Sequence, residues 1–422
     1  MSTLTKQDPF QLLLESAPSS FAPIRSQAKE VYLGLGLPAL KEEEYKFTPI
    51  TKKLDGKIKD FSPAAPIAIS KDVIQSAVFE GFEGDILVFS NGKFLPELSS
   101  QPEGLRITAL SEMESTPLGS IAKPEKDTFS ALNLSSFADG IFIGVPKKQQ
   151  VAKPVLLLSF NQAHSGQVIQ PRVWIEVGDF SEVTFIDQSI SLTEDSYFVN
   201  KVVEIKGGQN SHVNYYRLQN ESTNAIEVSN IQTDIFQDSR FTSVNLSLSG
   251  DMVRNNLTLN LLGSNSEGNM YGVYLLNGKT HVDNHTNVDH TLPHAESNEL
   301  YKGILADQSR GVFNGKIFVR QDAQKTNAFQ QNNNILLSED AIVNTKPQLE
   351  IWADDVKCSH GCTVGQLDEE ALFYLKARGI DKTTATGLLL YAFAGEVLEK
   401  IEEESFRSYA ISLIQDRLGS KF

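Results

Sequence analysis

A long run of short strand-like segments, with no helix between them, constrains the fold of this chain most strongly. From about residue 140 to residue 365, apolar and β-branched residues form short segments separated by turns rich in glycine, asparagine, aspartate and serine. Clear examples are PVLLLSF (154–160), RVWIEVG (172–178), SEVTFIDQSI (181–190), VNKVVEIK (199–206), SHVNYYRL (211–218), FTSVNLSLSG (241–250), NNLTLNLLG (255–263) and NMYGVYLL (269–276). This pattern predicts a mainly β protein.

The turn signals recur about every 30 residues, and this coarse repeat narrows the architecture. One interval, between Gly263 and Asp307, is longer at about 44 residues. A strand repeat of this length without crossover helices predicts a solenoid, and parallel crossovers are nearly always right-handed. We therefore expect a right-handed parallel β-helix, with a large β-sandwich or jelly roll as the alternative. The turns are Gly178-Asp179, Gly207-Gly208, Gln237-Asp238-Ser239, Gly263-Ser264-Asn265, Asp307-Gln308-Ser309 and Ser338-Glu339-Asp340.

The two ends of the chain have a helical pattern instead. The sequence predicts an N-terminal helical segment and linker at 1–84, the β-helix core at 85–366 and a C-terminal helical domain at 367–422. These helical segments could cap the exposed end rungs of a solenoid. In the C-terminal domain we expect three helices, whose N-caps are Asp368, Asp381 and Ser405.

The charge and composition of the chain exclude several classes of partner. The net charge is −15, whereas nucleic acids and anionic membranes are bound by basic surfaces. Two cysteines in 422 residues are too few for a disulfide framework and are typical of a reducing compartment. No apolar run of about 18 residues occurs, so we expect no transmembrane helix. These features predict a cytoplasmic protein that binds neither nucleic acid nor membrane.

The segment KCSHGC holds both cysteines of the chain and a histidine between them. If this segment is extended, Cys358 and His360 lie on the same side, because side chains alternate along a strand. A thiolate and an imidazole together suit iron, zinc or copper. Two ligands do not complete such a site, which usually has four. A metal site at Cys358 and His360 would therefore take its other ligands from elsewhere in the fold or from another chain. The alternative is a buried cysteine with a surface histidine beside it, since cysteine is among the residue types most often buried.

Four further histidines cluster in HVDNHTNVDHTLPH, at positions 281, 285, 290 and 294. On a helix, His281 with His285 and His290 with His294 would be metal-binding pairs. The surrounding threonines and valines favour a strand, and Pro293 opposes a helix. We therefore expect structural histidines in rungs and turns, and a zinc protein that uses these histidines remains an alternative.

A glycine-lysine pair in GVYLLNGKT (272–280) is a near miss to a phosphate-binding loop. The pattern requires four residues between the first glycine and the pair, and here there are five. The intervening residues favour a strand, and no helix follows. We expect that this chain binds no nucleotide.

Several segments of the chain together have a distinctive pattern. They are LPALKEEEYKFTP (37–49), YKGILAD (301–307), GVFNGKIFV (311–319), NNNILLSEDA (332–341), TKPQLEIWADDVKCSHGCTVG (345–365) and LFYLKARGI (372–380). These segments resemble one family, the SufB/SufD proteins of the SUF iron–sulfur cluster assembly machinery. Within that family, DDVKCSHG is more similar to the SufD branch than to the SufB branch.

The resemblance implies a scaffold subunit without catalytic turnover of its own. It implies a β-helix core between two helical domains, a heterodimer with SufB through the β-helix, and binding of the ATPase SufC to the C-terminal helices. It also implies that Cys358 and His360 belong to a shared site at the SufB interface, which holds a transient, nascent iron–sulfur cluster and supports iron acquisition. Two possibilities stay open: a homodimer when the chain is isolated, and a β-helix carbohydrate-active enzyme as another function.

Overall fold

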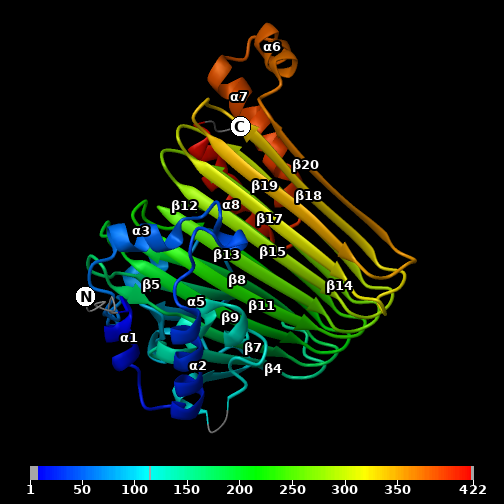
Figure 1. Ribbon diagram of the computed structural model, residues 1–422. Coiled ribbons are helices and arrows are strands. Elements are labelled where there is room, and N and C mark those ends of the chain that lie inside the picture. Colours follow the sequence, from blue (N-terminus) through cyan, green and yellow to red (C-terminus); the bar gives the residue numbers. More distant parts are fainter. Residues whose placement is uncertain (1–7, 114–115, 420–422) are drawn as a thin grey trace, which may run out of the picture.

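The computed structural model describes residues 8–113 and 116–419, and a two-sheet β-solenoid dominates it (Figure 1). Sheet B has the strand order β2-β1-β5-β8-β10-β12-β14-β16-β18-β20, and sheet A has the order β19-β17-β15-β13-β11-β9-β7-β4-β3. Pairing is parallel in both sheets except at β2 and β3. The predicted mainly β solenoid is therefore confirmed, and two face-to-face antiparallel sheets are excluded.

The strands of the two sheets alternate along the chain. Sheet B is built from Asp85–Ser90 (β1), Lys93–Phe94 (β2), Val155–Asn161 (β5), Glu182–Ser191 (β8), His212–Asn220 (β10), Arg240–Ser249 (β12), Glu267–Leu276 (β14), Glu296–Leu305 (β16), Asn327–Leu336 (β18) and Lys357–Gly365 (β20). Sheet A is built from Arg106–Ala109 (β3), Ile141–Val145 (β4), Arg172–Val177 (β7), Phe198–Gly207 (β9), Ile226–Ile235 (β11), Met252–Leu261 (β13), His281–His290 (β15), Arg310–Val319 (β17) and Ile342–Ile351 (β19), and Val168–Ile169 (β6) pairs with β9.

The register of the strands explains the repeat in the sequence. His281 pairs with Met252 on one side and with Arg310 on the other, each 29 residues away. One coil therefore takes about 30 residues and contains one strand from each sheet. The turns up to Gly263 follow strands of sheet A, whereas the turn at Asp307 follows a strand of sheet B. The longer interval of about 44 residues is thus one and a half coils. It contains β14, β15 and β16 and two corners, at 277–280 and at 291–295.

Helices cover the outer faces of the two sheets. On sheet A lie Gln11–Glu15 (α1), Ala22–Leu35 (α2), Ile50–Lys57 (α3) and Thr128–Ser136 (α5), whose apolar side chains share a core with β9, β11 and β13. On sheet B lie Lys71–Ala77 (α4), Lys382–Leu398 (α7) and Glu404–Arg417 (α8). The remaining helix, Glu369–Ala377 (α6), contains no buried residue and projects from the end of the solenoid (Figure 1).

The interior of the solenoid is a continuous apolar core with polar inclusions. Inward-facing residues such as Val203, Leu259, Val288 and Ile317 line it from sheet A. Towards its N-terminal half it also holds buried ion pairs, and Lys201 with Asp187 is an example. Because isolated buried charges are costly, such groups persist only when they are paired and hydrogen-bonded.

The two ends of the solenoid differ. At one end, the short strands β2 and β3 run antiparallel to their neighbours and form the edges of the two sheets. At the other end, β19 and β20 each pair on one side alone, and most of their residues are partly or fully exposed. The C-terminal helices pack on the outer face of sheet B, so they do not cap this last rung.

The helix caps agree with the sequence analysis at two of three positions. Asp368 and Asp381 accept backbone N–H groups at the starts of α6 and α7. The prediction of Ser405 at the third cap was wrong. The side chain of Glu403 accepts from the N–H groups of Ser405 and Phe406, because a glutamate can also reach the first turn of its own helix. Among the described residues, no helix is long and apolar enough to cross a membrane.

Candidate functional site

The last strand of sheet B carries both residues predicted to bind metal. Cys358 pairs in register with Ala328 of β18, and His360 pairs with Gln330. Ala328 and Gln330 are both buried and alternate with exposed neighbours, so they face the interior of the solenoid. Cys358 and His360 therefore lie on the same side of an extended strand, at the open end of the interior.

The two side chains differ in exposure. Cys358 is half-buried and packs against the interior core, whereas His360 is exposed. Desolvation raises the pKa of the Cys358 thiol, and a backbone hydrogen bond with Ala328 opposes that shift. In the described part of the chain, no group of three or more histidine, cysteine or acidic side chains could hold a metal ion. The metal role of Cys358 and His360 thus stays a prediction that needs ligands from outside the described chain.

The residues that align with His360 on the two preceding strands of sheet B are also polar, and we call this row the polar ladder. Gln330 pairs with His360 on β20 and with Glu299 on β16. Glu299 accepts hydrogen bonds from Thr286 Oγ1 at 2.7 Å and from Gln330 Nε2 at 3.2 Å. Burial raises the pKa of Glu299 to about 7. Nothing in the sequence marks this carboxyl, because its contacts arise only when neighbouring coils are aligned in register.

The four clustered histidines do not converge. His281 and His285 lie on the outer face of sheet A, next to the N-terminal segment, where His285 Nε2 is 3.0 Å from Asp283 Oδ1. His290 faces the interior and shares a hydrogen bond of 2.9 Å with Ser297 Oγ. His294 is exposed in the corner that follows β15. The histidines lie in one strand and in the corner after it, as expected, and alternation along the strand places His290 on the opposite face from His281 and His285.

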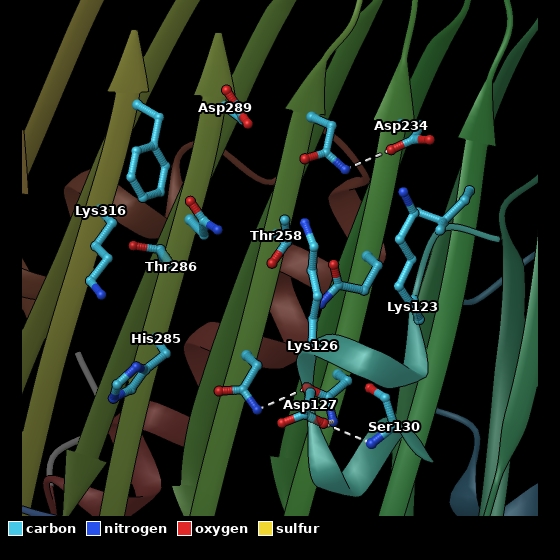
Figure 2. A pocket seen from close by; sticks show the side chains of 18 of the residues that line it. Lys123, Lys126, Asp127, Ser130, Asp234, Thr258, His285, Thr286, Asp289 and Lys316 are labelled. Carbon is cyan, nitrogen blue, oxygen red and sulfur yellow. Dashed lines mark hydrogen bonds between the residues drawn. The ribbon is translucent and has the colours of Figure 1, made fainter. Parts of the chain in front are cut away.

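A second feature is a polar groove on the outer face of sheet A, with a volume of about 630 Å³ (Figure 2). Its floor consists of outward-facing side chains from β11, β13, β15 and β17, such as Thr258 and Asn287. The segment at 120–130 forms one wall and carries Lys123 and Lys126, and Glu44 lies at the opposite wall beside Lys316. We call this feature the sheet-A groove.

Comparison with known protein families matches almost the whole chain. Residues 7–157 match the N-terminal region of SufBD proteins, and residues 160–393 match the SufBD core domain of the SUF system for Fe–S cluster assembly. The chain belongs to the SufBD family.

Three curated relatives each match about nine tenths of the chain or more. The iron–sulfur cluster assembly protein SufD of Escherichia coli is 31% identical over 411 residues, which cover 96% of this chain and 95% of that protein. A SufBD family protein of Synechocystis is 30% identical and covers 89% of this chain and 86% of its own length. Protein ABCI7 of Arabidopsis thaliana, a chloroplastic protein, is 28% identical over 94% of this chain and 86% of its own length.

The segments that resemble the SufBD family occupy distinct places in the structure. LPALKEEEYKFTP follows α2 and is fixed on sheet A by Tyr45, which packs under the Arg254 guanidinium at 4.0 Å. TKPQLEIWADDVKCSHGCTVG forms most of the open rung. LFYLKARGI forms most of α6, where Phe373 and Tyr374 are 72% and 58% exposed. The family signature is thus densest at the uncovered end of this SufBD protein.

Proposed function

We propose that this SufBD protein is a non-catalytic scaffold subunit of a cytoplasmic SUF complex. It pairs with SufB through the rung formed by β19 and β20, and it contributes Cys358 and His360 to a shared metal–sulfur site. That site receives iron and holds a nascent iron–sulfur cluster during assembly. The ATPase SufC binds the C-terminal helical region. The family match and the position of Cys358 and His360 on an unpaired edge support this proposal.

The unpaired edge is the single observation that carries the pairing. The outer backbone groups of β19 and β20 have no neighbouring strand among the described residues, so a second solenoid can continue both sheets by strand addition. Several large apolar side chains are exposed on or beside this rung, and they supply the buried area that a stable interface requires. They are Phe329, Leu337, Ile342, Ile351, Trp352 and Val364.

An edge site also explains the incomplete ligand set. Cys358 and His360 face the open end of the interior, so a partner that continues the sheets would bring its own side chains next to them. A thiolate and a neutral imidazole are both competent iron ligands, and metal binding favours the deprotonated thiol. Desolvation raises the pKa of the Cys358 thiol, which favours its protonated form, and a bound metal would oppose that effect.

The test uses the assembled complex, made by co-expression of this chain with SufB and SufC from the same genome. His360→Ala and Cys358→Ser are each expected to abolish or strongly reduce cluster formation in cells, without changing the size of the complex. His164→Ala is the matched control, because His164 is also exposed but lies far along the chain. Parental cluster formation in both site variants would refute the site.

The SufC-binding surface needs a milder change than deletion of residues 367–422. Helices α7 and α8 bury Leu390, Val397 and Phe406 against sheet B, so their removal would uncover the core. Phe373→Ser with Tyr374→Ser instead changes two exposed side chains of α6. We expect this double variant to lose SufC in copurification and to retain SufB, and undiminished SufC binding would contradict the assignment to α6.

A further inference from the structure

We propose that the sheet-A groove binds a small sugar phosphate, that is, a polyol that carries an anionic group. This site is separate from the edge at β20 and does not depend on the proposed scaffold role. The groove lies on the opposite sheet, between the N-terminal segment and the loop before α5. Its volume of about 630 Å³ is in the usual range of small-molecule sites.

The floor of the groove presents a regular array of amide and hydroxyl groups. In one row, Gln232, Thr258 and Asn287 occupy the same register position on three neighbouring strands, followed by Lys316 on β17. Neighbouring strands are about 4.8 Å apart, so the polar groups of the row are evenly spaced at that interval. A ligand with several hydroxyl groups can contact such an array at more than one point.

Two buried acceptor atoms in the groove have no hydrogen-bond donor among the described residues. The Oδ1 atoms of Asn287 and Asn314 are buried and accept no hydrogen bond, although both residues line the groove. Ser130, on the wall formed by residues 120–130, also lines the groove, and its side chain interacts with Asp127. Because an unsatisfied buried acceptor is costly, an occupant that donates O–H groups would stabilise this arrangement. Hydroxyl groups of a polyol meet that requirement.

Two lysines at one wall of the groove form no ion pair with any described residue, although one of them lies near a carboxyl. The pKa of Asp234, which also lines the groove, is raised by burial, and nearby Lys123 opposes that shift. Lys316 and Arg320 are paired with Glu44 and Asp289. Lys123 and Lys126 are exposed and form no ion pair with any described residue. Figure 2 shows both lysines on the segment in front of the strands. In a chain with a net charge of −15, two unpaired lysines at one wall single out this place for a phosphate group.

The wall that carries these lysines is held in place from below. The buried carboxylate of Glu204 accepts the backbone N–H groups of Gly119, Ile121 and Ala122 at 2.9 to 3.0 Å. On the far side of the lysines, Asp127 accepts from Ser130 N at 2.7 Å and from Asn230 Nδ2 at 3.1 Å. The segment is therefore fixed at both ends, so binding would require little ordering of the backbone.

Calorimetric titration of the full-length chain with glucose 6-phosphate, glucose and orthophosphate tests the site. We expect saturable binding of glucose 6-phosphate that is tighter than binding of either fragment. Lys123→Gln with Lys126→Gln should weaken it at least about tenfold, since charge-assisted hydrogen bonds are lost. Asn287→Ala should weaken glucose 6-phosphate and leave orthophosphate unchanged. Lys153→Gln, an exposed lysine in a distant loop, is the control and should change nothing.

Each contrary outcome overturns a stated part of the proposal. Absence of saturable binding by glucose 6-phosphate would refute the site. Binding that the double lysine variant leaves unchanged would place the ligand elsewhere on the chain and also refute it. Equal affinity for orthophosphate and glucose 6-phosphate would remove the polyol part and leave an anion site. None of these results would affect the experiments on Cys358 and His360.

Discussion

Arg172 and Glu204 form an ion pair on neighbouring strands of sheet A, and both side chains are completely buried. Glu204 also accepts the three backbone N–H groups that fix the wall of the sheet-A groove. One carboxylate therefore connects the solenoid to the segment that lies over it.

Replacement of Glu204 by alanine should destabilise the protein strongly. The change leaves the Arg172 guanidinium buried without its partner, which typically costs about 3 to 5 kcal/mol. Chemical denaturation measures the free energy of unfolding. Glu176→Ala is the matched control, because Glu176 pairs with Lys206 in the same sheet and both side chains are nearly half exposed. The control should change stability by less than about 1 kcal/mol.

Glu299→Gln should change how stability depends on pH. The pKa of Glu299 is raised from 4.5 to about 7 by burial, so the folded state holds a proton that the unfolded chain has already released in this window. Stability therefore falls as the pH rises from about 4.5 to 7, by up to about 3 kcal/mol. The glutamine variant should lose less stability between pH 5 and pH 8 than the parent. Glu296→Gln, an exposed change on the same strand, should behave like the parent.

His290→Gln should make the protein more resistant to acid. Burial lowers the pKa of His290 from 6.5 to about 4, so this imidazole stays neutral in the folded state. Its contribution to stability is present above pH 6.5 and is lost as the pH falls towards 4, by about 3 kcal/mol. Thermal unfolding at pH 5 and pH 7 measures the effect, and an unchanged pH dependence would contradict it. The exposed His164 provides the control as His164→Gln.

Isolated chains should self-associate through the open rung. Ile351 and Val364 are 40% and 49% exposed on β19 and β20, beside unpaired backbone groups. Ile351→Lys with Val364→Lys places two charges on this edge and should shift the chain to a monomer, because edge lysines oppose strand pairing. Sedimentation velocity over a range of concentrations measures the change. Leu12→Lys, at an equally exposed site on α1, should leave the association as it was.

The sequence predicted the solenoid because its signals are local. Apolar runs and turn residues mark each strand and corner, and the predicted strand at 211–218 differs from β10 by at most two residues at either end. The alternation of side chains was likewise enough to place Cys358 and His360 on one side of β20. Strand position and side-chain alternation are both set by residues that are close together in the sequence, so they can be predicted from it.

The sheet-A groove could not be predicted, because its parts are distant in the sequence. Lys126 and Lys316 meet across one groove only after the coils are stacked and the segment at 120–130 is laid over them. The polar residues of its floor alternate as in any solvated sheet face. The ladder from His360 to Glu299 was hidden for the same reason, since coil register decides it.

The unequal ends of the solenoid limit how far such chains can polymerise. The antiparallel strands β2 and β3 blunt one end, whereas β19 and β20 leave the other open for pairing. A chain with two open ends could add further copies indefinitely and grow into a filament. With one open end, association stops at a closed pair. The end formed by β2 and β3 thus opposes fibre formation, while the end formed by β19 and β20 stays available to a partner.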